Sequence, residues 1–411
     1  MRILHRSFAL LVCVLAIGVL DAQSIKTGTP ASVGMSAERL AKIKPAMQAA
    51  IDAKQVAAVE TLVARRGVVV HHERLGIEPD AIFRLASMTK PVTSVAIMML
   101  AEEGKLLLAD PVSRFIPSFK EMRVLAPASS TSSGDDVGTV PARRQITIED
   151  LLTHRSGLVY GFIDRGPVGE TYKKNGVCDA FCTKTTLAEN VDLIARQPLK
   201  FHPGAAYEYS VSIDVLGRLV EVVSGLSLDE FLRRRIFEPL GMRDTHFNLP
   251  AAKGGRLAPL FAIDKGVMSR ASNQGAYVGA TYYSGGAGLV STMNDYFRFA
   301  QMLVNSGELD GTRLLGRPTV DLMMSSHTQD LRPSAVSPGH GFGYGGSVRE
   351  SLGAGTRPSS EGTFGWAGIF GTHFWVDRKQ QLVTILMDQI SPFHTRTAEV
   401  FQVLSYAAIV E

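Results

Sequence analysis

The sequence predicts a mixed α/β (α+β) fold with one antiparallel sheet built from both ends of the chain. Two β-rich segments, 59–64 and 68–72, lie near the N-terminus, and the next β-rich region begins only at residue 341. Helical patterns and loops dominate the sequence between them. We therefore expect a sheet from the N- and C-terminal segments, flanked by helices, and a mostly α-helical lobe inserted between the strands.

These elements predict a single two-lobed domain over residues 23–411. The α/β lobe takes in about 36–86 and 335–411, and the helical lobe about 87–334. A cleft between two lobes is the natural place for a binding site. The formal net charge is +4 and no run of like charges stands out, which argues against a nucleic-acid partner.

The first residues have the pattern of a signal peptide. Arg2 and Arg6 precede an apolar run of 13 residues from Phe8 to Leu20, and Ala22 follows. The run falls short of the ~20 residues that cross a bilayer. We expect a signal peptide over 1–22, a secreted or periplasmic protein, and no stable membrane insertion after cleavage; an uncleaved anchor is the alternative.

Two cysteines, Cys178 and Cys182, lie beyond the predicted cleavage site. An oxidising compartment lets a disulfide persist, but a ring this short demands particular backbone geometry. The spacing leaves open both a disulfide and two thiols.

The elements of the α/β lobe follow in chain order. Ser36 can cap a helix with apolar positions up to Ile51, and Arg65-Arg66-Gly67 joins the first two strands as a hairpin. We expect the C-terminal strands at 341–348, 363–369, 372–377 and 381–387, and a last helix at 395–409.

The middle of the chain predicts helices with clear ends. Gly104 ends one and Gly225 ends another, and Thr292 with Asp295 has capping-box spacing. Residues 127–144, rich in Ser, Thr, Gly and Asp, predict a mobile surface loop. The helices are expected over 87–103, 214–224, 228–236 and 292–305.

Ser87 and Lys90 are the candidate nucleophile and base. Ser87 lies at the first turn of a helix that is apolar nearly all round, and Lys90, three residues on, shares its face. The helix N-terminus favours the negative charge of an alkoxide and of an oxyanion. Burial lowers a lysine pKa from ~10.4 by up to ~3–5 units, after which the amine accepts the serine proton. The alternative is a capping serine beside a solvated lysine.

Tyr209 is the candidate partner of Lys90. It follows the turn at Pro203-Gly204, and its phenol can share a proton with the amine, either accepting from Ser87 or relaying to the leaving group. The sequence leaves open which of the two is the base, because strongly coupled groups titrate as a pair. Tyr207 competes with Tyr209, and spacing does not choose between them.

Three motifs in this order carry a family resemblance. Ser87-Met88-Thr89-Lys90 matches Ser-x-x-Lys, Tyr209-Ser210-Val211 occupies Tyr-x-Asn, and Trp366-Ala367-Gly368 occupies the Lys-Thr-Gly or His-x-Gly position. The chain thus resembles serine β-lactamases and penicillin-binding proteins, and especially family VIII carboxylesterases. The supporting segments 151–158, 238–242 and 286–292 extend the likeness to about 36–409.

The resemblance implies a β-lactamase/transpeptidase-like fold and a catalytic set of Ser87, Lys90 and Tyr209. It further implies an oxyanion hole of the backbone N–H groups of Ser87 and Ile369, and substrate contacts from Trp366 and Gly368. No metal or cofactor is implied. His154 resembles a structural histidine of this superfamily, and the chain has no Gly-x-Ser-x-Gly elbow.

Two departures from the motifs bear on the substrate. Val211 replaces an amide, and Trp366 replaces a cationic or imidazole residue that helps lactamases bind a carboxylate. A lost charge-assisted hydrogen bond costs ~1.5–3 kcal/mol, or roughly ten- to a hundredfold in affinity. An indole instead favours neutral groups.

We therefore expect a secreted serine hydrolase that cleaves small-molecule carboxylic esters through a Ser87 acyl-enzyme. A β-lactamase, a D-amino-acid peptidase or a transesterase acting on an ester or amide with the same site is the alternative. A non-catalytic binding protein that retains the fold is the alternative of another class.

Overall fold

The computed structural model describes residues 25–126, 138–180, 182, 185–271, 277–328, 331, 333–393 and 395–411. The predicted signal peptide, 1–22, lies outside this part of the chain. Among the described residues, no helix has both the length and the apolar character needed to cross a bilayer.

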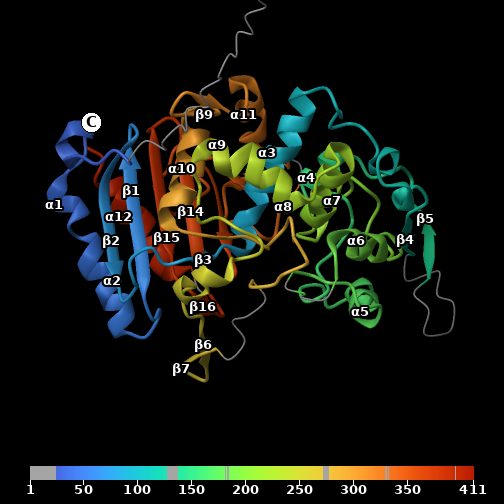
Figure 1. The fold of residues 1–411 in the computed structure, drawn as a ribbon, viewed down its shortest axis with the longest axis horizontal. Coiled ribbons are helices and arrows are strands. Elements are labelled where there is room, and N and C mark those ends of the chain that lie inside the picture. Colours follow the sequence, from blue (N-terminus) through green and yellow to red (C-terminus); the bar gives the residue numbers. More distant parts are fainter. Residues whose placement is uncertain are drawn as a thin grey trace, which may run out of the picture.

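A seven-stranded antiparallel sheet forms one side of the molecule, and it joins the two ends of the chain (Figure 1). β1 pairs with β15 so that Glu60 faces Met387 and Arg65 faces Leu382. This confirms the sheet predicted from N- and C-terminal segments. The strand order is β11 His340–Phe342, β12 Ser347–Arg349, β13 Phe364–Gly368, β14 Thr372–Asp377, β15 Leu382–Met387, β1 Val59–Arg65 and β2 Val68–Leu75.

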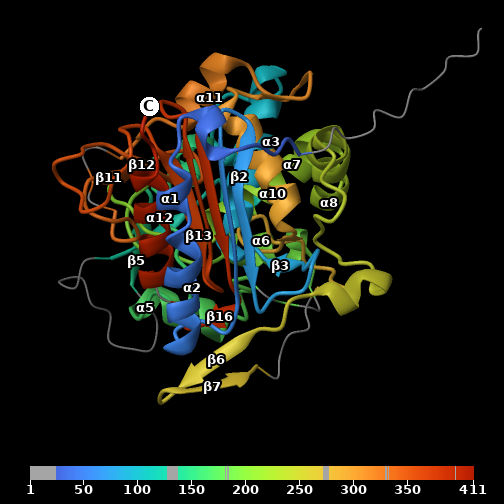
Figure 2. The ribbon, with the colours of Figure 1, turned by 90° about the vertical axis from the view of Figure 1, so that its left-hand side faces the viewer.

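Helices cover both faces of this sheet. On one face lie α1 Ala37–Leu40, α2 Ile43–Asp52 and α12 Arg396–Ala407, where α12 contacts both α2 and β15 (Figure 2). On the other face α10, Met293–Val304, packs on β14 and β15. All residues of β1 and β15 are buried, as expected for strands covered on both faces.

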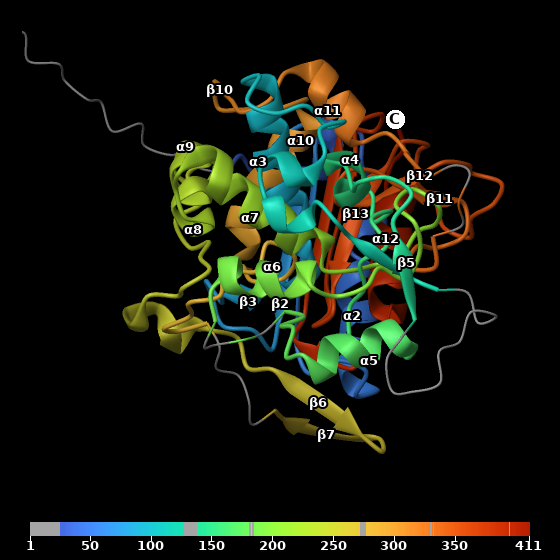
Figure 3. The same cartoon turned by 90° about the vertical axis from the view of Figure 1, so that its right-hand side faces the viewer.

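The helical lobe stands beside the sheet and is built around α7, Ser212–Ser224 (Figure 3). α7 packs against α3, Thr89–Glu102, whose residues from Thr89 to Leu100 are all buried. α7 ends at Gly225, where a φ of 75° suits a residue without Cβ. The other main helices of the lobe are α4 Ile148–Leu152, α5 Pro167–Lys174, α6 Leu187–Ala195 and α8 Leu228–Leu232.

Short elements connect these layers. η2, Ala86–Met88, precedes α3 and contacts β13 and β14. The others are η1 Pro30–Val33, β3 Phe83–Arg84, η3 Val112–Arg114, η4 Pro117–Phe119, α9 Glu238–Leu240, η7 Ala251–Arg256, β8 Val290–Ser291, β9 Glu308–Leu309, β10 Thr312–Arg313, α11 Arg317–Met323 and β16 Ile390–Ser391.

The structure corrects several predicted elements. The strand predicted at 341–348 is two strands, β11 and β12, because the chain reverses at Gly345, which has a φ of 88°. The helix predicted after Ser36 is split into α1 and α2. The helix predicted at 228–236 ends in a π-helical turn, η6 Arg233–Phe237, after α8.

Two short hairpins lie where the sequence predicted none. The loop predicted at 127–144 contains β5, Thr139–Pro141, which pairs with β4, Arg123–Leu125; its residues 127–137 lie outside the described part of the chain. β6 Phe261–Asp264 and β7 Val267–Arg270 form the second hairpin. Both involve strands of three or four residues, too short to show a clear alternation in sequence.

Candidate active site

The structure places Ser87 and Lys90 side by side where η2 leads into α3. The Lys90 amine lies 3.0 Å from the Ser87 hydroxyl oxygen, and the Lys90 side chain is fully buried. Ala86, just before Ser87, has a φ of 45° and no exposed surface. A buried residue with Cβ in the left-handed region is strained, a feature that clusters at functional sites.

Three acceptors surround the Lys90 amine, one for each N–H of an ammonium group. Besides Ser87, it donates to the Tyr160 hydroxyl at 3.0 Å and to the carbonyl of Gly286 at 2.8 Å. The amine also lies 4.6 Å from the centre of the Tyr209 ring, within cation–π range. The protonated lysine is therefore well held inside the protein, and it still faces Ser87.

Burial has a large effect on the lysine. Desolvation lowers the pKa of Lys90 to about 7, although the carboxylate of Asp214 acts to raise it. With such a pKa, the lysine is neutral in about half of the protein molecules at pH 7. It can then accept the proton of the Ser87 hydroxyl, which is the role that the Ser-x-x-Lys spacing predicts.

The structure brings Tyr209, and not Tyr207, to the nucleophile. The Tyr209 hydroxyl accepts a hydrogen bond from the indole N–H of Trp366 at 3.1 Å. Burial raises the pKa of Tyr209, while hydrogen bonds with Ser87 and Trp366 oppose that rise. The Tyr207 hydroxyl is buried without a hydrogen-bond partner among the described residues, and its ring packs against Phe342.

His154 packs against the ring of Tyr209. Its ring lies 4.8 Å from the Tyr209 ring, and its Nδ1 accepts the backbone N–H of Ser210 at 3.3 Å. Burial lowers the pKa of His154, and the nearby Lys90 lowers it further, so that the imidazole is neutral. This placement matches the structural role expected for His154.

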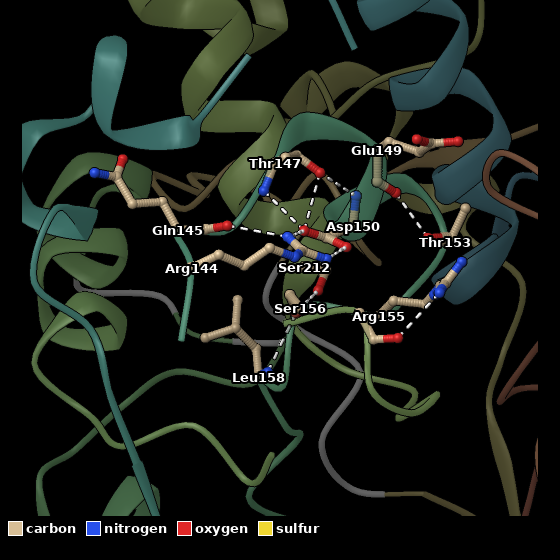
Figure 4. Close-up of polar contacts among 11 residues, drawn as sticks. Arg144, Gln145, Thr147, Glu149, Asp150, Thr153, Arg155, Ser156, Leu158 and Ser212 are labelled. Carbon is tan, nitrogen blue, oxygen red and sulfur yellow. Dashed lines mark hydrogen bonds and ion pairs between the residues drawn. The ribbon is translucent and has the colours of Figure 1, made fainter. Parts of the chain in front are cut away.

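The segment that carries His154 is tied down by polar contacts (Figure 4). Thr147 and Asp150 form a capping box at the start of α4, and Arg144 donates to the Asp150 carboxylate at 2.9 Å. The hydroxyls of Ser156 and Ser212 lie 2.8 Å apart and link the segment to α7. These contacts fix the chain on its way to Tyr160.

Gly368 is the last residue of β13 and Ile369 follows it, and Gly368 lies against Leu85, which leads into Ser87. A Cβ on Gly368 would lie 2.2 Å from the carbonyl oxygen of Leu85 and 2.4 Å from the hydroxyl of Thr372. Only glycine permits this approach of β13 to η2. Ser87 and Ile369 both line the pocket described next, as their predicted place in an oxyanion hole requires.

A pocket of about 370 Å³ opens beside Ser87, and it is lined mostly by apolar and aromatic side chains. Trp366 and Ile369 form part of it, and among the described residues that line it Arg357 alone carries a permanent charge. A neutral, apolar substrate group suits such a surface better than a carboxylate. The other lining residues include Tyr160, Phe162, Ile163, Ala180, Tyr209, Val336, Trp375 and Phe393.

Two residues of the site, Tyr160 and Asp214, were missed by the sequence analysis. Asp214 is fully buried on α7, where it accepts hydrogen bonds from Ser284 at 2.6 Å and Tyr282 at 3.1 Å. Burial raises the pKa of Asp214 to about 6. An acidic residue inside an apolar helix was the available sequence clue, whereas Tyr160 was marked only by its place two residues after the segment 151–158.

Comparisons with known proteins show the family and the fold of the chain. The family model named Beta-lactamase matches residues 41–405. An uncharacterized protein of Mycobacterium tuberculosis is 34% identical over 331 residues, which cover 77% of this chain and 79% of the relative. Esterase EstB of Burkholderia gladioli is 28% identical over 396 residues, covering 87% and 92%.

A solved structure extends the likeness. It is that of EstCE1, described as a hydrolase with promiscuous acyltransferase activity, and it superimposes with a TM-score of 0.78 at 26% identity. The match covers 91% of this chain and 99% of EstCE1.

Proposed function

The chain belongs to the β-lactamase family of serine hydrolases, and on that basis we propose that it cleaves carboxylic esters through an acyl-enzyme on Ser87. The likeness to EstB and EstCE1 supports an ester substrate within the family. The apolar pocket beside Ser87, with Trp366 at the third motif, is the observation that carries the choice of an ester over a carboxylate-bearing lactam.

The proposed reaction has two acyl-transfer steps. The Ser87 oxygen bonds to the ester carbonyl carbon while its proton passes to the neutral Lys90 amine 3.0 Å away. The carbonyl electron pair moves to the oxygen, which the N–H groups of Ser87 and Ile369 stabilise. Collapse expels the alcohol, which takes a proton from the Lys90–Tyr209 pair, and water then cleaves the acyl-enzyme to release the acid.

Substrate comparison tests the ester assignment. Short-chain p-nitrophenyl esters and a chromogenic cephalosporin should be measured with the same preparation of mature protein. The esters are expected to have the higher kcat/KM, because the pocket offers apolar surface where lactamases bind a carboxylate. A higher kcat/KM for the cephalosporin would make the protein a β-lactamase and reject the proposal.

Labelling tests whether the fold is catalytic at all. A fluorophosphonate probe is expected to modify Ser87 in the wild type and to leave Ser87→Ala unmodified, as read by intact mass and peptide mapping. Absence of labelling in folded wild-type protein would favour the hypothesis that the chain is a non-catalytic binding protein.

We also propose that the protein is exported. The signal peptide pattern at 1–22 is one support, and the bond between Cys178 and Cys182 is the other, since such bonds persist mainly in oxidising compartments. Expression of the full chain in a secreting bacterial host tests this. The exported protein should lack residues 1–22 by intact mass, and full-length protein retained in the cytosol would contradict export.

A further inference from the structure

A disulfide lies at the edge of the pocket. Cys178 and Cys182 are bonded, with their Cα atoms 6.1 Å apart, which decides between the two possibilities that the sequence left open. Ala180 lines the pocket. Asp179, its neighbour, carries a carboxylate that contacts the chain following Tyr160.

The Asp179 carboxylate holds two consecutive peptide groups. One oxygen accepts the backbone N–H of Gly161 at 2.8 Å, and the other accepts that of Phe162 at 3.0 Å. Hydrogen bonds to an ionised acceptor are stronger than neutral ones. The carboxylate therefore fixes the backbone at the point where it passes from the lysine contact of Tyr160 to the pocket wall.

Phe162 depends on this support more than Tyr160 does. Tyr160 is buried, with 2% of its surface exposed, and its hydroxyl is bonded to Lys90. Phe162 has 51% of its surface exposed and lines the pocket, and its ring lies 5.2 Å from that of Tyr160. Loss of the Asp179 contacts should release Phe162 and leave Tyr160 in place.

The backbone next to Asp179 is held in place at Cys178. The Asn190 side chain on α6 accepts the backbone N–H of Cys178 at 2.7 Å and donates to its carbonyl at 2.9 Å. The same amide donates to the Tyr282 hydroxyl, which in turn donates to Asp214. The disulfide extends this fixed point to Cys182, so that Asp179 lies between two tethered residues.

We propose that Asp179, held by the Cys178–Cys182 disulfide, is a positioning residue that sets the acyl-chain preference by fixing Phe162 in the pocket wall. The inference rests on the proposed function, because it assigns a chain preference to the same ester-binding pocket. The wall made by Phe162 and Ala180 offers apolar surface to a longer acyl chain and nothing additional to an acetyl group.

Kinetics on p-nitrophenyl acetate, butyrate, hexanoate and octanoate test the inference. Asp179→Asn is expected to keep kcat on acetate within about twofold. On octanoate it should lower kcat/KM about tenfold through a higher KM, which is the loss expected when about two methylene groups of the acyl chain are no longer buried. The disulfide variant Cys178→Ser/Cys182→Ser should change the profile in the same direction. Asp192→Asn, an exposed aspartate on α6, is the matched control and should match the wild type.

Phe162→Ala keeps the test decisive if Asp179→Asn folds poorly, because half of the Phe162 surface is already exposed. It should reproduce the octanoate loss, and the double variant Asp179→Asn/Phe162→Ala should lose no more than either single one, since both act through one contact. Equal losses on all chain lengths, or additive losses in the double variant, would overturn the inference.

Labelling separates this inference from the proposed function. The rates at which a methyl and an octyl fluorophosphonate modify Ser87 need no ester turnover. A wild type that reacts with neither probe and hydrolyses no ester rejects the proposed function. If the wild type reacts and Asp179→Asn shows the same ratio of octyl to methyl labelling rates as the wild type, only the role of Asp179 is rejected.

Discussion

The indole N–H of Trp366 donates a hydrogen bond to the Tyr209 hydroxyl over 3.1 Å, and thereby joins the third motif of the site to the second. Burial opposes a phenolate on Tyr209 by raising its pKa, and the indole donor acts in the opposite direction. Trp366 thus has two effects: it places a neutral indole at the third-motif position in the pocket wall, and it stabilises negative charge on the Tyr209 oxygen.

Trp366→Phe separates these two effects, because it removes the N–H and keeps an apolar aromatic wall. The loss of one hydrogen bond is expected to lower kcat on p-nitrophenyl esters about two- to tenfold with little change in KM. Trp375→Phe is the matched control, since Trp375 lines the same pocket and is not the donor to Tyr209. A rise in KM with unchanged kcat would show that Trp366 only binds substrate.

Tyr209→Phe is expected to lower kcat/KM by at least ~100-fold, the usual range for loss of a group that transfers a proton. Tyr207→Phe is the internal control and should keep activity within about threefold, because its hydroxyl bonds to no described residue. Ester kinetics with both variants decide the point. If Tyr207→Phe is the more damaging change, the assignment of Tyr209 is wrong.

The sequence predicted the parts of this protein that depend on local pattern. β14 was expected at 372–377 and lies there residue for residue, because turns bound it on both sides and its side chains are almost all buried. The helix after Ser87 was likewise marked by its apolar residues and by Gly104. A single sheet from the two ends of the chain was expected because no other strong β-rich segment lies between them, whereas the pairing of β1 with β15 is shown only by the structure.

The parts that were missed depend on contacts between distant residues. Lys90 meets Tyr160 across 70 residues and the carbonyl of Gly286 across 196, and nothing in the local sequence marks either as a partner of the lysine. The choice between Tyr207 and Tyr209 was open for the same reason. Both precede α7, and the His154 ring packs against both. Only the hydrogen bond from Trp366 and the position of the Lys90 amine over the Tyr209 ring show which tyrosine belongs to the site.

The rate on esters is expected to rise with pH through a value near 7. Below that pH the Lys90 ammonium has no lone pair for the serine proton, and above it the neutral amine accumulates, since burial lowers the pKa of Lys90 to about 7. The other titratable groups close to the amine are Asp214, whose charge raises that pKa, and the neutral Tyr160, Tyr209 and His154. A pH profile of kcat/KM measures the rise.

Asp214→Asn tests the charge that opposes this effect. The amide keeps an oxygen to accept from Ser284 and Tyr282 but removes the negative charge that raises the pKa of Lys90. The rising limb of the profile is therefore expected to move to lower pH. Asp192→Asn, exposed on α6, should leave it in place. A shift to higher pH would mean that Asp214 does not act on Lys90 through its charge.

Gly368→Ala is expected to separate the two halves of the oxyanion hole. The added Cβ would lie 2.2 Å from the Leu85 carbonyl and 2.4 Å from the Thr372 hydroxyl, so the end of β13, with Ile369, must move away from Ser87. Loss of one oxyanion donor costs about 100- to 1,000-fold in kcat, and the ester rate should fall by that order.

Gly353→Ala is the control for this change, because a Cβ there meets no atom within 4 Å. Thermal unfolding of Gly368→Ala, followed by circular dichroism, shows whether the fold survives. If the variant folds, fluorophosphonate labelling of Ser87 should also slow, since formation of the phosphonyl adduct places charge on an oxygen in the same hole. Wild-type rates of ester cleavage and labelling in folded Gly368→Ala would remove Ile369 from the oxyanion hole.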